Sequence, residues 1–335
     1  MAEQSLDEFH KFPKLCNDLR RHALTFLYPP TLINYSLCAE ECNNYIQRFP
    51  TKAPDNVSIT ENRCAQSGRG SIDLTLEYSK PHGNDGRIYR RDEKACFEYT
   101  DVLSHDEAMR KMEEHFLKVS RYMTRRTTNQ LEIDVAQWPT GVLNFGFFSN
   151  VEHMTVNMWH SMFVNFIEFC RTTDMRPSQL ILRPPWHSSF RPSNPEGIRE
   201  IMQSEFFKQA ESVDVKIEWG INAEDFLGLQ NPRVSFKLDH HLISNRAIRQ
   251  KIDELNNSGT IQYIHISVPF FRIPFKLRDI YPNEYEQETA RARAEAARDF
   301  WALDVQSVNQ LVIGRVRVRT MNSNQDLIIT NGDNI

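Results

Sequence analysis

The sequence predicts a mixed α/β protein, α+β overall, and three observations support this prediction. Residues 72–78 alternate strictly between apolar and polar side chains, which is typical of a half-buried strand. Short strand patterns alternate with helical patterns between residues 130 and 268. Residues 12–49 hold two apolar clusters at helical spacing, separated by a Pro-Pro step. We therefore expect a small N-terminal helical module followed by a larger βα domain.

Changes in composition along the chain set the expected domain boundaries. Residues 1–11 are polar, and we expect a disordered tail there. The helical module covers residues 12–49, because the Pro-Pro step ends one helix and Thr31 can cap a second. Residues 50–70 are rich in Pro, Asn, Ser and Thr, which indicates a linker or an irregular crossing. Residues 71–335 then form the α/β domain.

The α/β domain is expected to repeat a simple pattern of helix and short strand. A first helix begins after Ser104, whose side chain can cap it together with Glu107. Later helices are expected at about 154–172, 195–210, 222–228 and 244–257, and strands at 130–135, 179–182, 212–218, 233–238 and 262–268. Strands bracketed in this way lie mostly parallel, with helices on one or both faces. The uneven repeat spacing fits an irregular leucine-rich-repeat-like domain, and a closed doubly wound sheet is the alternative.

The C-terminal residues predict a β-hairpin with a basic face. Its strands are expected at 311–320 and 326–330. Arg315, Arg317 and Arg319 occupy alternate positions and so share one face, which makes them a candidate contact surface for anions or carboxylates. A solvated face that protects an edge strand is the alternative interpretation.

Four aromatic residues near prolines are candidate anchors for a protein partner, since aromatic side chains dominate the energetics of interfaces. They are Trp186, Phe190, Phe270 and Phe271. Core packing under loops is the alternative interpretation, and it is the one that the sequence favours.

The composition excludes several classes of protein. Hydrophobic residues make up 40% of the chain, which is enough for a substantial core. The net charge of −4 argues against nucleic acid as a partner, because nucleic-acid-binding domains are usually basic. No apolar run is long enough for a membrane helix, and the N-terminal residues show no signal-peptide pattern. Together with six scattered cysteines, this predicts a cytoplasmic or nuclear protein with reduced thiols and no membrane partner.

The sequence predicts neither a metal site nor a cofactor. Cys38 and Cys42 could supply two thiolates from one helix, but a structural zinc ion needs four ligands and no second pair is present. The chain has only 12 glycines, and no Gly-rich phosphate-binding motif is among them. We therefore expect buried, uncoordinated thiols.

The sequence carries no established catalytic motif, so we expect that the protein is not an enzyme. Asp239, His240 and His241 follow a predicted strand, where active-site loops often lie, and His265 or His187 could join them. Adjacent residues of an extended strand point to opposite faces, which places His240 and His241 poorly for one shared ion. Solvated loop histidines are therefore the favoured interpretation, and an enzyme with its site at these aspartate and histidine residues is a competing hypothesis.

Four motifs occur in a fixed order along the chain. They are FP-x-L at 12–15 with LINYSLC at 32–38, then WGINAEDFL at 219–227 with LQN at 229–231 and VSF at 234–236, then LISN at 242–245 with YIHI at 263–266, and last a hairpin around 313–329. In this order they resemble the large nematode F-box protein family. The first resembles the F-box, the next two resemble the core of the type-2 F-box-associated domain, and the last resembles the closing hairpin of that domain.

The resemblance implies a substrate-recognition subunit of a ubiquitin ligase. An F-box docks on the Skp-type adaptor of a cullin-RING ubiquitin ligase, and the C-terminal domain then holds a protein substrate near the ubiquitin-charged enzyme. Such a subunit does no bond chemistry and acts by raising effective concentration. On this resemblance, the apolar residues that face the adaptor or form the core of the module are Phe12, Pro13, Leu15, Leu19, Leu24, Leu32, Ile33 and Leu37.

The chain departs from the family pattern at two places. Residues 16–18 read Cys-Asn-Asp, where the family carries Leu-Pro. Residues 322–324 read Asn-Ser-Asn in place of an Asp-Gly turn, and Asn also tolerates the left-handed conformation. The first departure motivates an alternative function, which is a non-catalytic interaction scaffold of the same fold that no longer binds the adaptor.

Overall fold

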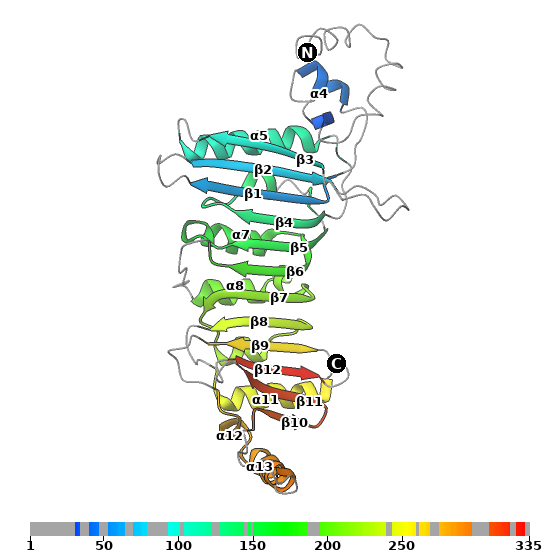
Figure 1. Cartoon of the computed structure of the whole chain (residues 1–335). Coiled ribbons are helices and arrows are strands. Elements are labelled where there is room, and N and C mark those ends of the chain that lie inside the picture. The colour runs from blue at the N-terminus through cyan, green and yellow to red at the C-terminus, as the bar shows by residue number, and fades with distance from the viewer. Residues whose placement is uncertain are drawn as a thin grey trace, which may run out of the picture. The chain divides into compact units, whose positions relative to one another are not determined.

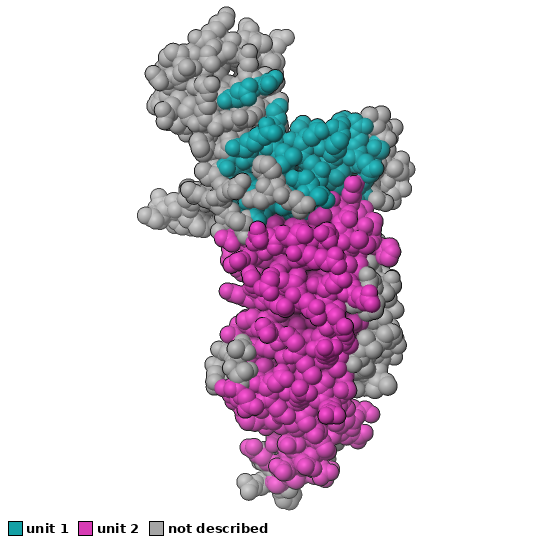
Figure 2. All heavy atoms as spheres, turned by 180° about the vertical axis from the view of Figure 1, so that it is seen from behind, with its two compact units in different colours: residues 1–128, 139–148 teal, residues 129–138, 149–335 magenta. Residues whose placement is uncertain are grey.

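The structure of the chain is a computed structural model whose described residues form two compact units. The described residues are 31–33, 40–46, 53–63, 70–78, 93–100, 104–121, 123, 128–143, 147–148, 150–185, 195–238, 243–258, 261–268, 275–296, 308–321 and 326–331. Unit 1 comprises residues 1–128 and 139–148, and unit 2 comprises residues 129–138 and 149–335 (Figure 2). Both units contain helices and strands, so the prediction of a mixed α/β protein is confirmed.

Unit 1 contains an antiparallel meander of three strands. These are β1 (Asn56–Arg63), β2 (Gly70–Tyr78) and β3 (Glu93–Thr100), and each pairs with the next (Figure 1). The strand predicted at 72–78 is confirmed as part of β2, in which buried apolar residues alternate with half-buried polar ones. Towards the N-terminus, residues 31–33 are helical and α4 (Glu40–Ile46) is a short helix.

Strand β1 lies within the stretch 50–70, so the prediction of a linker or irregular crossing is wrong there. Val57 and Ile59 are buried in β1. Polar residues of β1 also pair across the sheet, as when the Asn56 side-chain amide donates to the Glu77 carboxylate at 2.8 Å. Such cross-strand partners stabilise a polar strand, and they are not visible in the composition of that strand alone.

Helix α5 (His105–Ser120) confirms the helix predicted after Ser104. The Ser104 hydroxyl accepts a hydrogen bond from the Glu107 backbone N–H at 3.2 Å, which is the expected N-cap. The helix contacts β2 and β3. Its buried Phe116 ring lies 5.7 Å from the ring of Phe147 and 5.6 Å from that of Phe148, beside the short helix α6 (Thr140–Leu143) of the same unit.

Unit 2 is built on a sheet whose middle strands are parallel. Its strands are β4 (Thr128–Asp134, whose first residue belongs to unit 1), β5 (Asn150–Asn157), β6 (Arg176–Arg183), β7 (Ser212–Trp219), β8 (Arg233–Leu238), β9 (Tyr263–Ser267), β10 (Gln310–Ile313), β11 (Val316–Met321) and β12 (Asp326–Asn331). Within this unit their order is β10-β11-β12-β9-β8-β7-β6-β5-β4. The parallel pairing predicted from the βα alternation is confirmed for the strands from β5 to β9. Strand β9 pairs with β12 in the antiparallel direction, and β10, β11 and β12 form an antiparallel meander.

The helices that connect the parallel strands lie on one face of this sheet (Figure 1). The helices of unit 2 are the 3-10 helix η2 (His160–Met162), α7 (Phe163–Thr172), α8 (Pro195–Gln203), α9 (Glu205–Lys208), α10 (Ala223–Leu227), α11 (Asn245–Ser258), α12 (Leu277–Ile280) and α13 (Pro282–Ala296). Helix α9 contacts β6, and α11 contacts β11 and β12. Right-handed crossovers between neighbouring parallel strands place helices on one side of a sheet.

The helix-covered face of the sheet is apolar. One register row crosses eight strands, and none of its side chains is more than 2% exposed. The row consists of Met154, Leu180, Val213, Val234, Ile264, Ile329, Val318 and Leu311. Its burial against the helices forms the core of unit 2.

Two helices predicted in unit 2 have different bounds in the structure. β5 occupies the start of the stretch predicted as a helix at 154–172, and α7 begins only at Phe163. The apolar spacing around residue 154 fits both periods, so periodicity could not separate strand from helix. The predicted helix 195–210 is two helices, since Ser204 starts α9 by accepting a hydrogen bond from the Phe207 backbone N–H at 3.2 Å.

Gly314 divides the strand predicted at 311–320 into β10 and β11. Its φ is +60°, a left-handed conformation that side chains other than glycine disfavour. A Cβ at this position would lie 2.8 Å from the Asn256 side-chain oxygen. That oxygen also accepts a hydrogen bond from the Arg315 backbone N–H at 3.1 Å, so Asn256 has little freedom to move away.

The Gly314→Ala substitution should lower the free energy of unfolding by about 1–2 kcal/mol, because it forces an L side chain into the left-handed region. Urea unfolding followed by circular dichroism measures the change. Gly228→Ala is the matched control, since φ is −72° there and an added Cβ would meet its nearest atoms at 3.5 Å and beyond. An equal loss in both variants would contradict the argument.

Candidate functional site

The face of the unit 2 sheet opposite the apolar row is polar, and we call it the polar face. Two register rows define it. The tyrosine row consists of Gln179, Ser212, Arg233, Tyr263, Thr330, Arg317 and Val312. The histidine row consists of Ile181, Asp214, Ser235, His265, Ile328, Arg319 and Gln310. Apart from Ile328, these residues are half-buried or exposed, because strand side chains alternate between the two faces.

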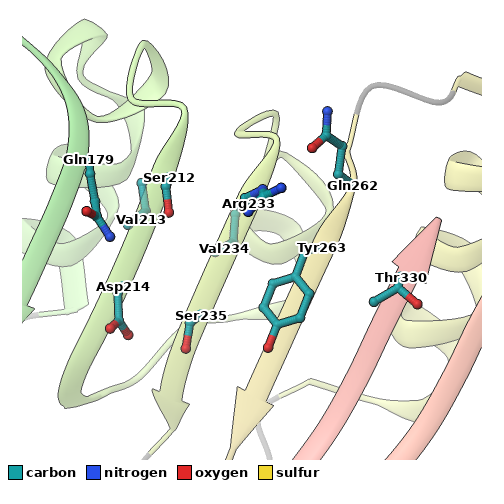
Figure 3. A pocket seen from close by; sticks show the side chains of 10 residues that line it. All are labelled: Gln179, Ser212, Val213, Asp214, Arg233, Val234, Ser235, Gln262, Tyr263 and Thr330. Carbon is teal, nitrogen blue, oxygen red and sulfur yellow. The ribbon is translucent and has the colours of Figure 1, made fainter. Parts of the chain in front are cut away.

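A hollow of about 470 Å³ lies on the polar face over β6, β7, β8, β9 and β12 (Figure 3). Its lining residues are mainly polar, and they are Gln179, Ser212, Asp214, Arg233, Ser235, Gln262, Tyr263 and Thr330, together with Val213 and Val234 of the apolar row. Sites for cofactors and drug-sized molecules are usually lined by apolar side chains with a few polar groups. This hollow is lined mainly by polar residues, which favours contact with a polar polypeptide surface.

Three carboxylates on the polar side of the sheet each lie close to a basic side chain. Asp214 lies 3.3 Å from the Lys216 ammonium, and Glu218 lies 3.5 Å from the Lys237 ammonium. Asp326 of β12 lies 3.3 Å from the imidazole Nε2 of His265 on the neighbouring strand β9. The Asp214 and Glu218 carboxylates are therefore compensated by lysines, whereas the imidazole offsets the charge of Asp326 only when it is protonated.

Three arginines of the polar face have no such compensation. Within the described part of the chain, the guanidinium groups of Arg233, Arg317 and Arg319 make no hydrogen bond or ion pair. Arg233 and Arg319 are exposed, and Arg317 is half-buried. Burial raises the pKa of Tyr263 above its usual value, while the nearby charge of Arg319 opposes the shift and those of Asp214 and Asp326 add to it. The Tyr263 phenol therefore stays protonated and can donate or accept a hydrogen bond.

Ser235, His265 and Asp326 lie in a chain across three strands that has the composition of a hydrolytic triad. The Ser235 hydroxyl is 3.2 Å from His265 Nδ1, and Asp326 is 3.3 Å from Nε2. A nucleophilic serine also needs free N–H donors for the developing oxyanion. Ser235 lies in the middle of β8, between the ladders to β7 and β9, whose backbone N–H groups are used in strand pairing. We therefore assign these residues to cross-strand contacts of the polar face.

Of the arginines predicted to share a face, Arg317 and Arg319 do so, and Arg315 does not. Arg315 follows Gly314 in the turn between β10 and β11. Its guanidinium donates to the Leu255 carbonyl of α11 at 2.9 Å, on the helix side of the sheet. The prediction is wrong for Arg315 because it assumed an unbroken strand.

The structure describes only one of the residues on which the competing catalytic hypothesis depends. His265 lies on the polar face, whereas Asp239, His240, His241 and His187 lie outside the described residues. The described residues contain no group of three or more His, Cys, Asp or Glu side chains that could hold a metal ion. Among the cysteines that the structure describes, Cys170 is buried, which raises the pKa of its thiol well above the usual value, whereas Cys42 is half-buried and Cys96 is exposed. The expectation of buried thiols therefore holds for Cys170 and is wrong for Cys96.

The predicted adaptor-binding residues are also described only in part. Leu32 and Ile33 are buried, with 9% and 1% of their surfaces exposed. Phe12, Pro13, Leu15, Leu19, Leu24 and Leu37 lie outside the described residues, as do Cys38 and the predicted anchors Trp186, Phe190, Phe270 and Phe271.

Within the described ranges, no helix combines the length and the apolar character needed to cross a bilayer.

Comparison of the chain with models of protein families, with curated proteins and with solved structures finds no match in any of the three. Sequence reasoning did not single out Arg233, Tyr263 or Thr330. All three occupy polar alternate positions in strands that were predicted, and that alternation is the signal that could have found them.

Proposed function

We propose that this protein is the substrate-recognition subunit of a Skp–cullin–F-box type ubiquitin ligase. Residues 12–49 would dock on a Skp-type adaptor and, through it, on a cullin. The α/β domain would hold a protein substrate. The observation that supports substrate binding is the polar face of unit 2, which lies opposite the helices and carries uncompensated arginines. The adaptor contact is supported by the resemblance of residues 12–15 and 32–38 to an F-box.

The arrangement of unit 2 favours a leucine-rich-repeat-like domain over a doubly wound sheet. In a doubly wound fold, helices cover both faces of the sheet. Here the connecting helices follow parallel strands in order and lie on one face (Figure 1). Stacked units of this kind leave a continuous surface that repeat proteins use to bind other proteins. We therefore interpret unit 2 as a non-catalytic binding domain.

The proposed mechanism needs no chemistry from this chain. A receptor that holds a substrate beside a ubiquitin-charged enzyme converts a bimolecular encounter into an effectively intramolecular one. The rate then depends on how long the substrate stays bound and on whether its lysines can reach the enzyme. A ligase subunit of this kind would work in the cytoplasm or the nucleus, which is the location that the sequence predicts.

Titration of the purified full-length chain with a purified Skp-type adaptor tests the adaptor contact. We expect direct binding in a calorimetric titration. The Leu32→Asp substitution should weaken it by about a hundredfold or more, since it places a charge among the apolar side chains that bury Leu32 and disrupts the helical segment that would dock. Val164→Asp is the matched control, because Val164 is 70% exposed on α7 of unit 2 and should not affect the adaptor.

Failure of the wild-type chain to bind the adaptor would contradict the ligase assignment. The alternative function, a non-catalytic interaction scaffold of the same fold, would then be favoured. The Cys-Asn-Asp sequence at 16–18, which replaces Leu-Pro, is the observation that motivates this alternative. In both functions unit 2 binds a protein, so the adaptor experiment separates them cleanly.

A further inference from the structure

The tyrosine row places two uncompensated arginines at a fixed separation on the polar face. Arg233 of β8 is the register partner of Tyr263, Tyr263 pairs with Thr330, and Thr330 pairs with Arg317 of β11. The two arginines are therefore three strand spacings apart, or about 14 Å at roughly 4.8 Å per spacing. An extended peptide rises about 3.4 Å per residue, so side chains four residues apart span the same distance.

The positive charge around the tyrosine row contrasts with the negative net charge of the whole chain. The chain as a whole has a net charge of −4. Around the tyrosine row, Asp214 already lies beside Lys216, and Asp326 beside His265. Arg319 lies two residues after Arg317 on β11, and its guanidinium is the third, in the histidine row. Carboxylates and phosphates are the groups that such planar, fork-shaped donors bind with two parallel hydrogen bonds, and an acidic polypeptide supplies the carboxylates.

Apolar side chains stand exposed at the same end of the face. Val312 is 63% exposed and is the register partner of Arg317, so it ends the tyrosine row on β10. Met321 is 44% exposed and pairs with Asp326 on the same side of the sheet. Val312 therefore offers a bound segment an apolar contact directly beside Arg317.

We propose that the tyrosine row binds an acidic segment of a partner protein, extended across the strands. Two acidic residues four positions apart contact Arg233 and Arg317. The residue between them on the same side faces the polar hollow beside Tyr263 and Thr330, where a small hydroxyl side chain fits. An apolar residue two positions beyond the second acid contacts Val312. Under the proposed function, on which this reading of the partner rests, the segment is the recognition signal of the ligase substrate.

Fluorescence anisotropy of labelled peptides with the purified full-length chain tests this inference. The probe peptides carry Glu-x-Ser-x-Glu-x-Leu and the reverse order Leu-x-Glu-x-Ser-x-Glu in a Gly-Ser background, because either chain direction fits the row. The control peptides replace both Glu by Gln, or set the two Glu side by side. We expect at least one probe peptide to bind about tenfold or more tighter than its controls, and binding to weaken as salt is added.

Single charge reversals identify the contacts. Arg233→Glu and Arg317→Glu should each weaken binding of the probe peptide by about tenfold. Arg246→Glu is the matched control, since Arg246 is exposed on α11 on the helix side of the sheet, and it should leave binding unchanged. A peptide with one Glu replaced by Lys should bind Arg233→Glu better than it binds the wild type. This charge-swap rescue distinguishes a lost contact from a misfolded variant.

Several results would overturn the inference. These are equal binding of the Glu and Gln peptides, equal loss in Arg246→Glu, no rescue by the Lys peptide, and tighter binding of a single-stranded oligonucleotide that competes with the peptide. The assay contains no adaptor, so its outcome is independent of the ligase assignment. Adaptor binding without peptide binding removes this inference alone, and peptide binding without adaptor binding removes the ligase role alone.

Discussion

Replacing Trp219 by Ala should lower the free energy of unfolding by about 3–5 kcal/mol, the usual range for a large aromatic side chain removed from a core. Trp219 ends β7 and is fully buried. Its ring centroid lies 6.3 Å from that of Phe207 in α9 and 6.4 Å from that of Phe236 in β8. Removing the indole leaves a cavity between a helix and two strands. These elements could close the cavity only by losing contacts that they make elsewhere.

Equilibrium unfolding in urea, followed by circular dichroism, measures the effect. Trp219→Phe is the informative control. Within the described residues the indole N–H has no hydrogen-bond partner, so Phe retains much of the packing and removes an unsatisfied donor. We expect it to cost less than half as much as Ala. A loss below about 1 kcal/mol for Trp219→Ala would show that the site collapses and that the ring does not support the core.

The Asn231→Asp substitution should be similarly damaging, at about 3–5 kcal/mol, because it leaves a buried charge without a partner. Asn231 is 1% exposed, in the loop before β8. Its side-chain amide nitrogen donates to the Phe207 carbonyl at 2.8 Å and to the Ala210 carbonyl at 2.9 Å. A carboxylate of the same shape has no donor and would set negative oxygens against these carbonyl oxygens.

The neighbouring residue supplies a matched control for this change. Gln230 is exposed, and Gln230→Glu makes the same chemical replacement of an amide by a carboxylate, with an expected change within about 0.5 kcal/mol. Asn231→Ala should fall between the two, since it loses the donors without adding a charge. If Asn231→Asp were no worse than Asn231→Ala in urea unfolding, the amide would not be the feature that fixes this loop.

The sequence by itself determined the type and order of most elements, because local periodicity and capping are visible in neighbouring residues. The alternation at 72–78, the Ser104 cap of α5 and the strands β6 to β9 were all predicted. Predictions failed at β5, where the apolar residues fit both the helical and the strand period, and at Gly314, where a left-handed backbone angle divides one predicted strand into two.

Only the tertiary structure decided the candidate site. Arg233, Tyr263 and Arg317 belong to strands that are far apart in the sequence, and the order in which those strands pair brings them into one row. A register shift of one residue would turn each of these side chains to the helix-covered face. Register is set by packing of the apolar row against the helices, which is a property of the whole sheet. The sequence could therefore predict which strand residues are polar, while the fold determined which of them form one surface.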